Sequence, residues 1–170
     1  MPIFTINTLI GQKAKPSDLW LVDGKKDWAF IRGKLAEKLE VPDGTPIRLL
    51  DGNERSFGAR HVYKKQRRKT IQDILRKHQS TKDRYKDICE TDTYAAEYVW
   101  LKLNSSGNAY TTEEDNKTKI ALSMNPSSLL ILTRQDKDEL FYSITSLIPR
   151  PNNNLDGKSL GRYLSSWANK

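Results

Sequence analysis

The sequence has few of the residues that build disulfides and structural metal sites. It contains one cysteine and two histidines in 170 residues, so it can form neither an intrachain disulfide nor a Cys/His zinc site of the usual spacing. It has no apolar run near the roughly 18–20 residues of a membrane span, and no signal peptide pattern at its start. It also lacks a Walker A loop, a glycine-rich dinucleotide fingerprint and a Gly-x-Ser-x-Gly elbow. We therefore expect no membrane span, no Sec-type export, no metal and no cofactor.

Positive charge is abundant and is concentrated in one segment. The chain has 29 Lys and Arg against 21 Asp and Glu, a net charge of +8. Residues 58–86 hold eleven basic and two acidic residues, a net charge of +9, which leaves −1 for all the rest. A helix face that serves only solubility interleaves acids at i,i+4, and this segment has almost none. The distribution predicts a polyanionic partner, with nucleic acid as the leading candidate.

The length suits a single domain over residues 1–170. Periodicity and turn residues predict helices in the first half and strands in the second, an α+β fold with N-terminal helices packed on a C-terminal antiparallel sheet of about four strands. The predicted helices are 28–39, 57–77 (one helix or a pair) and 155–167, and the predicted strands are 46–50, 97–103, 119–124, 128–133 and 139–148. The last two strands form the clearest hairpin in the chain.

The segment 59–68, if helical, separates an apolar side from a basic one. The basic side contains Arg60, His61, Lys64, Lys65, Arg67 and Arg68. Cations lower the pKa of a neighbouring imidazole, so His61 would be largely neutral at pH 7 and able to act as a general base or to bind phosphate. The alternative is that His61 pairs with a carboxylate or packs at a helix end.

A second cluster consists of hydroxyl groups on the strand 139–148. A period of two predicts that Ser143 and Thr145 share one face, and that Ser146 lies on the other face with Tyr142 and Ile144. Hydroxyls on a strand suit the floor of a phosphate site, although the β propensity of Ser and Thr can also place them on an ordinary solvent face. Arg134 and Arg150 lie nearby in the sequence and could supply cations.

Several of these runs resemble one nuclease superfamily. They are the segments 26–31 (KDWAFI), 35–39 (LAEKL), 45–49 (TPIRL) and 56–62 (SFGARHV), followed by the hairpin segments 130–134 and 141–146. Together they are similar to the barnase/EndoU/colicin/RelE-like superfamily, in particular its phage and polymorphic-toxin branch. The resemblance covers the core 26–150, with 1–25 as a lead segment and 151–170 as a C-terminal helical segment.

The resemblance implies metal-independent endoribonuclease activity that leaves 2′,3′-cyclic phosphate ends. By motif, His61 corresponds to the helix histidine and Thr145 or Ser146 to the strand hydroxyl, while Lys64, Lys65, Arg67 and Arg68 stand where a further basic residue or histidine often follows. It also implies a toxin that acts in the cytoplasm, whether or not it arrives as a secreted effector module. Such a toxin has an inhibitor, an immunity protein or antitoxin, which here would need an acidic face.

The sequence is therefore compatible with two main classes of function. In the first, an endoribonuclease, His61 assists attack of a ribose 2′-hydroxyl, and Lys64, Lys65 or Arg134 stabilises the phosphorane. Thr145 or Ser146 fixes a non-bridging oxygen, and the remaining predicted RNA and phosphate ligands are Arg60, Arg67, Arg68, Ser143 and Arg150. In the second, the segment 58–86 binds nucleic acid without catalysis. A protein-interaction domain with a basic patch is a third reading.

Overall fold

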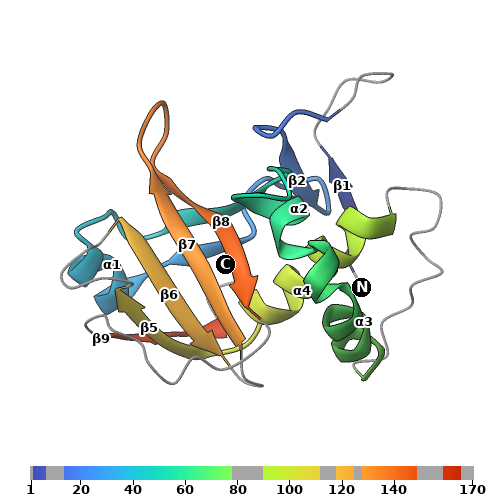
Figure 1. Ribbon diagram of the computed structural model, residues 1–170. Coiled ribbons are helices and arrows are strands. Elements are labelled where there is room, and N and C mark those ends of the chain that lie inside the picture. The colour runs from blue at the N-terminus through green and yellow to red at the C-terminus, as the bar shows by residue number, and fades with distance from the viewer. Residues whose placement is uncertain are drawn as a thin grey trace.

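The protein is described from a computed structural model, which places residues 2–6, 14–77, 90–111, 118–124, 128–148 and 159–165. These ranges contain four α-helices, one 3-10 turn and nine strands (Figure 1). The helical elements are α1 (Gly33–Leu39), α2 (Gly58–Val62), η1 (Lys65–Arg67), α3 (Arg68–Lys77) and α4 (Glu90–Leu103). The strands are β1 (Phe4–Ile6), β2 (Leu19–Val22), β3 (Ala29–Ile31), β4 (Thr45–Leu50), β5 (Gly107–Thr111), β6 (Lys119–Met124), β7 (Ser128–Gln135), β8 (Phe141–Ile148) and β9 (Ser159–Tyr163).

All nine strands of the described chain join one mixed sheet, in the order β1-β2-β4-β8-β7-β6-β5-β9, with β3 paired to β4 off this path. The pairing of β4 with β8 is parallel, with Ile47 opposite Tyr142, and the other pairings are antiparallel. The predicted architecture, N-terminal helices on an antiparallel sheet of about four strands, is therefore wrong. The central pairing joins segments that lie far apart in the chain, and no local pattern signals such a pairing.

One face of the sheet forms the core. Ile120, Leu122, Leu130, Leu132 and Ile144 are all buried on it, and each fully buried aliphatic side chain contributes about 1.5–3 kcal/mol. The sheet curves so that its last strand, β9, comes to lie against α1 (Figure 1). Helix α2 packs against β8, and this contact positions the candidate site.

The segment 97–103, predicted as a strand, belongs to helix α4, so that prediction is wrong. Its alternating apolar residues are not one face of a strand, because all side chains from Tyr94 to Val99 are buried. The helix packs against α2, α3 and β1, and Trp100 meets the ring of Trp28 edge-on at 6.0 Å between centroids. A helix buried on several sides lacks the single apolar stripe that marks an amphipathic helix.

The helix predicted over 155–167 is also wrong where the structure describes it, since Ser159–Tyr163 form strand β9. Ala109 pairs with Gly161 and Tyr110 with Ser159, so Leu160 is an extra residue in a β-bulge. The bulge places Leu160 and Tyr163, three residues apart, both in the core. A spacing of three imitates the period of a helix, which explains the error.

Other predicted elements are confirmed. The strand 46–50 corresponds to β4, the helical segment 57–77 to α2, η1 and α3, and 119–124 to β6; the hairpin is β7 and β8. The helix predicted over 28–39 is correct only from Gly33, because Ala29–Ile31 form strand β3. Within the described ranges, no helix has both the length and the apolar character that would carry it across a membrane.

Candidate active site

A tight loop between β4 and α2 fixes the position of the first functional side chain. Gly52 and Gly58 have positive φ angles of 69° and 84° and lie so close that a Cβ on Gly52 would be 1.9 Å from the carbonyl oxygen of Phe57. Between them, the Asn53 side chain accepts hydrogen bonds from the backbone N–H groups of Arg55 and Ser56. These contacts hold the loop 53–57 against the start of α2.

Asp51 anchors this loop to the core. Its carboxylate is 1 % exposed and accepts hydrogen bonds from Trp20 Nε1 at 3.1 Å and from Arg60 Nε at 2.9 Å. The backbone N–H of Arg60 also donates to the Asp51 carbonyl oxygen at 3.1 Å. Arg60, predicted to bind RNA, is thus an anchor of α2.

The same loop orients the ring of His61. The Nδ1 atom of His61 lies 2.9 Å from the backbone carbonyl oxygen of Glu54. A carbonyl oxygen only accepts, so Nδ1 carries the proton and donates it. In the described part of the chain Nε2 has no hydrogen-bond partner, and the ring is only partly buried. His61 therefore presents Nε2, with its lone pair in the neutral form, for proton transfer.

The surroundings of His61 favour this neutral form. Burial lowers the pKa of His61 below its usual 6.5, and the hydrogen bond to the Glu54 carbonyl raises it in part. The positive charges of Lys64 and Arg67 then lower the pKa of His61 further. The imidazole is accordingly uncharged at neutral pH, as a general base must be.

Arg67 joins the helical segment to strand β8. Its Nη1 donates to Ser146 Oγ at 2.8 Å and to the Leu147 carbonyl oxygen at 3.0 Å. Burial lowers the pKa of the guanidinium, which still remains cationic at neutral pH. Within the described ranges, Arg67 forms no ion pair with a carboxylate, and these two bonds use only one of its three nitrogens. Arg67 is thus a partly buried cation with donors left for an anion.

A β-bulge in β8 gathers the hydroxyl groups. Ile131 pairs with Ser146 and Leu132 with Ile144, so Thr145 is the extra residue. Residues that are paired across two strands lie on the same face of the sheet. Thr133 pairs with Ser143, and it lies on the same face as Ile131 because the two are separated by two positions on β7.

Ser143 and Ser146 consequently lie on the same face, and the prediction that placed Ser146 opposite Ser143 is wrong. The hydroxyl of Thr145 is hydrogen-bonded to that of Thr133, which puts Thr145 on this face as well. Arg67 reaches the face from the helical side through Ser146.

Among the described residues, the side chains of the other predicted RNA and phosphate ligands form no hydrogen bond with the side chain of His61 or of Ser146. Lys64 is close enough to His61 to affect its pKa, and Lys65 is exposed, with its backbone N–H 3.4 Å from a Glu54 carboxylate oxygen. Three predicted ligands have protein partners: Arg68 Nε donates to the Tyr63 carbonyl oxygen, Arg134 pairs with Asp136 at 2.8 Å, and Ser143 Oγ is bonded to the Thr133 carbonyl and to Gln135. Arg150 and the second histidine, His78, lie outside the described residues.

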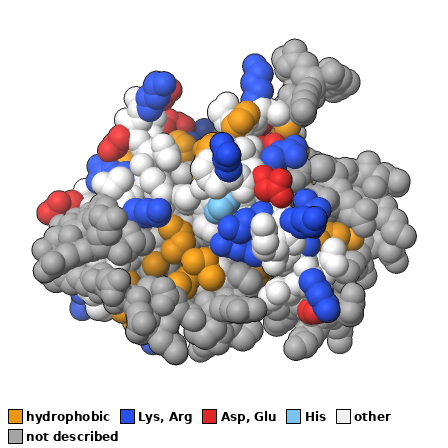
Figure 2. Space-filling view, in the orientation of Figure 1, with side chains coloured by type: hydrophobic (Ala, Val, Ile, Leu, Met, Phe, Trp, Pro, Cys, Tyr) orange, Lys and Arg blue, Asp and Glu red, His pale blue; other side chains and the backbone are white. Residues whose placement is uncertain are grey.

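The structure therefore brings His61, Lys64, Arg67 and Ser146 together, and Thr145 is next to Ser146 in β8 but bonds to Thr133. Figure 2 shows Lys and Arg side chains gathered over the helices on this side of the molecule, with hydrophobic side chains beside them on the sheet. Two participants were missed in the sequence: Thr133, which has no distinguishing pattern, and the Glu54 carbonyl, which any residue could supply. In the ranges that the structure places, no three His, Cys, Asp or Glu side chains come together as metal ligands could.

Comparisons with protein-family models, with curated proteins and with solved structures find no match. The resemblance to the barnase/EndoU/colicin/RelE-like superfamily stays a prediction. The function is accordingly argued from the geometry of this site alone.

Proposed function

We propose that the protein is a metal-independent endoribonuclease, in which His61 removes the proton from a ribose 2′-hydroxyl. The observation that supports this most directly is the oriented imidazole: Nδ1 donates to the Glu54 carbonyl, Nε2 has no hydrogen-bond partner in the described chain, and Lys64 and Arg67 lie close enough to lower the pKa of the ring. A general base contributes about 10²–10⁴-fold to a rate when it is in reach of the proton.

In the proposed reaction the 2′-oxygen attacks the adjacent phosphorus as its proton passes to His61 Nε2. The bond from phosphorus to the 5′-oxygen breaks, which leaves a 2′,3′-cyclic phosphate. The departing 5′-oxygen takes its proton from water, since His61 is the one histidine in the described part of the chain. The hydroxide that this leaves takes the proton from His61 Nε2, which returns the ring to its neutral form. No oxidant, metal or further reactant is consumed.

Arg67 and Ser146 stabilise the negative charge that develops on the non-bridging oxygens of the phosphorane. The guanidinium is held by Ser146 Oγ and the Leu147 carbonyl, so its remaining N–H groups are fixed before substrate arrives. Ser146 Oγ accepts from Arg67 and can donate its own proton to a non-bridging oxygen. Lys64 adds a second positive charge beside the ring.

The proposal is tested by the products and by one substitution. The protein is incubated with mixed RNA in EDTA, and the fragments are examined for 2′,3′-cyclic phosphate ends. We expect such ends, and we expect His61→Ala to lower the rate by about 10²–10⁴-fold. Cleavage at the parental rate by folded His61→Ala would exclude His61 as the base.

The basic segment also supports a second function, binding of nucleic acid without cleavage. Residues 58–77 contain eight basic residues and one acidic residue, which is enough for phosphate contacts along a backbone. Both functions predict binding that weakens with salt, so salt does not separate them. A complex with RNA that forms in EDTA and releases no fragments would support the binding module and overturn the nuclease.

A further inference from the structure

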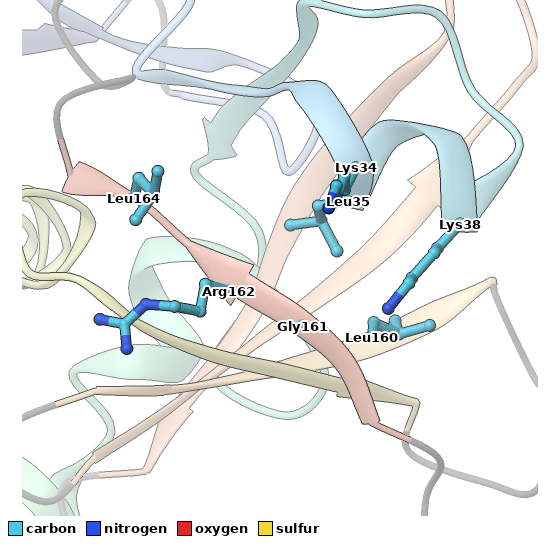
Figure 3. Close-up of a pocket in the computed structure, with 7 residues that line it drawn as sticks. All are labelled: Lys34, Leu35, Lys38, Leu160, Gly161, Arg162 and Leu164. Carbon is cyan, nitrogen blue, oxygen red and sulfur yellow. The ribbon is translucent and has the colours of Figure 1, made fainter.

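A groove lies between α1 and the edge strand β9, at the end of the sheet away from the candidate active site (Figure 3). Its volume is about 320 Å³, the lower end of the range for ligand sites. Leu35, Leu160 and Leu164 give it an apolar lining. Leu164 is 36 % exposed, and the only other exposed large hydrophobic residue in the described ranges is Ile3. Leu35 and Leu160 are buried in the floor of the groove, so Leu164 is the lining leucine that is open to water.

The rim of the groove is positively charged. Lys34 and Lys38 lie one turn apart on α1, and Arg162 is on β9; all three are exposed. No carboxylate of the described chain forms an ion pair with any of them, and none of the lining residues is acidic. Gly161, with φ at 95°, leaves the floor between these cations without a side chain. Lys34 and Lys38 therefore lie on the α1 side of an apolar floor, Arg162 extends from β9 away from α1 (Figure 3), and the described lining residues supply no counter-charge.

We propose that this groove is a protein-docking surface for an acidic segment of a partner that inserts a leucine-like side chain. Leu164 and the apolar floor beneath it match an aliphatic group, and Lys34 and Lys38 match carboxylates beside that group, with Arg162 available to a carboxylate beyond β9. The groove is open, so an occupant stays partly in water, as a segment of a larger chain does. It contains no aromatic ring on which a base could stack, which disfavours nucleic acid. Its position on a sheet edge is one that partner segments commonly use.

The test uses the full chain, labelled with ¹⁵N, and an acetylated hexapeptide Leu-Glu-Leu-Asp-Leu-Glu. We expect amide shifts of α1 and β9 to move as this peptide is added. Two control peptides replace either every leucine by alanine or every acid by lysine. Each control is expected to bind at least about tenfold more weakly, because it loses either the apolar contact or the charge match.

Substitutions then localise the contact. Lys34→Glu combined with Lys38→Glu should weaken binding of the acidic peptide by about tenfold or more, since two attractions become repulsions. Leu164→Gln should weaken it without any change of charge. Lys137→Glu and Asp138→Lys together, on the exposed β7–β8 turn, keep the net charge and should have no effect. Lys137→Glu alone changes the net charge by −2, as Lys34→Glu does, and controls for that change.

Three results would each overturn the proposal. The first is that the peptide moves amide shifts outside α1 and β9 but not within them. The second is that Lys137→Glu weakens peptide binding as much as a single Lys34→Glu does, and the third is that an RNA oligonucleotide or decanoate binds in the groove more tightly than the acidic peptide. No cleavage is measured, and no residue of the candidate active site is changed. Failure of the docking proposal is therefore distinct from failure of the nuclease proposal.

Discussion

Arg67 and Arg68 are neighbours in the sequence with equal charge, yet the structure gives them different tasks. Arg67→Ala removes two hydrogen bonds, to Ser146 Oγ at 2.8 Å and to the Leu147 carbonyl at 3.0 Å. A hydrogen bond from a charged donor contributes about 1.5–3 kcal/mol when buried. Because the guanidinium is only partly buried, we expect Arg67→Ala to lower the free energy of unfolding by about 1.5–3 kcal/mol in total.

Arg68→Ala is the matched control. It removes one hydrogen bond, to the Tyr63 carbonyl at 3.1 Å, and a guanidinium that lies 5.7 Å from the centre of the Tyr63 ring. Both contacts are at an exposed position, so we expect a loss of about 0.5–1.5 kcal/mol. The net charge of the protein changes by the same amount in the two variants.

The two variants should differ most in cleavage. Loss of a donor held against a developing oxyanion costs about 10²–10³ in rate, and only Arg67 is placed for this. The assay is single-turnover cleavage, in EDTA, of a DNA oligonucleotide that contains one ribonucleotide, with urea unfolding to confirm that each variant is folded. Arg67→Lys should recover only part of the rate, since an ammonium lacks the planar fork. An equal loss of rate in Arg67→Ala and Arg68→Ala would show that Arg67 contributes only net charge.

Two further predictions follow from the loop and the ring that it holds. Cleavage should increase with pH through the pKa of His61, which lies below 6.5, because only the neutral ring accepts a proton. Arg67→Ala should move this acidic limb to higher pH, since that cation lowers the pKa of His61; a limb that does not move in the pH–rate profile would contradict the assignment. Gly58→Ala should lower the free energy of unfolding by about 3 kcal/mol, because its Cβ would lie 2.6 Å from the Leu50 carbonyl oxygen at a positive φ. Gly24→Ala, with a similar φ and no atom within 4 Å of its Cβ, should cost only about 1–2 kcal/mol in urea unfolding, and equal losses would disprove the packing argument.

Elements with a strong local pattern were predicted correctly from the sequence. The β7–β8 hairpin is two apolar runs around a polar turn, and the predicted helical segment 57–77 contains α2, η1 and α3. The nine-stranded sheet was not predictable in this way. Strands β1 and β3 have three residues each, too short to show a period, and they are recognisable only through their pairing partners.

Both β-bulges conceal the true orientation of side chains from the sequence pattern, for the same physical reason. An extra residue reverses the alternation of a strand, so residues three apart face the same side. In β9 this put Leu160 and Tyr163 in the core together, and the spacing predicted a helix. In β8 it moved Ser146 to the face of Ser143. A bulge depends on the partner strand, so a single-strand pattern does not reveal it.

One part of the candidate site comes from residues that are close together in the sequence, and the other part comes from a distant strand. Only the arrangement of the first part could be predicted from the sequence. His61 and its basic neighbours lie within one short helical segment, and the bond to Glu54 spans seven residues, so a histidine among cations was visible at once. The Arg67–Ser146 bond spans 79 residues and depends on α2 packing against β8. The chemistry needs both halves, because a base without a fixed cation has no means to stabilise the phosphorane. The position of β8 in the sheet, beside β4, is therefore as much a part of the proposed site as the histidine.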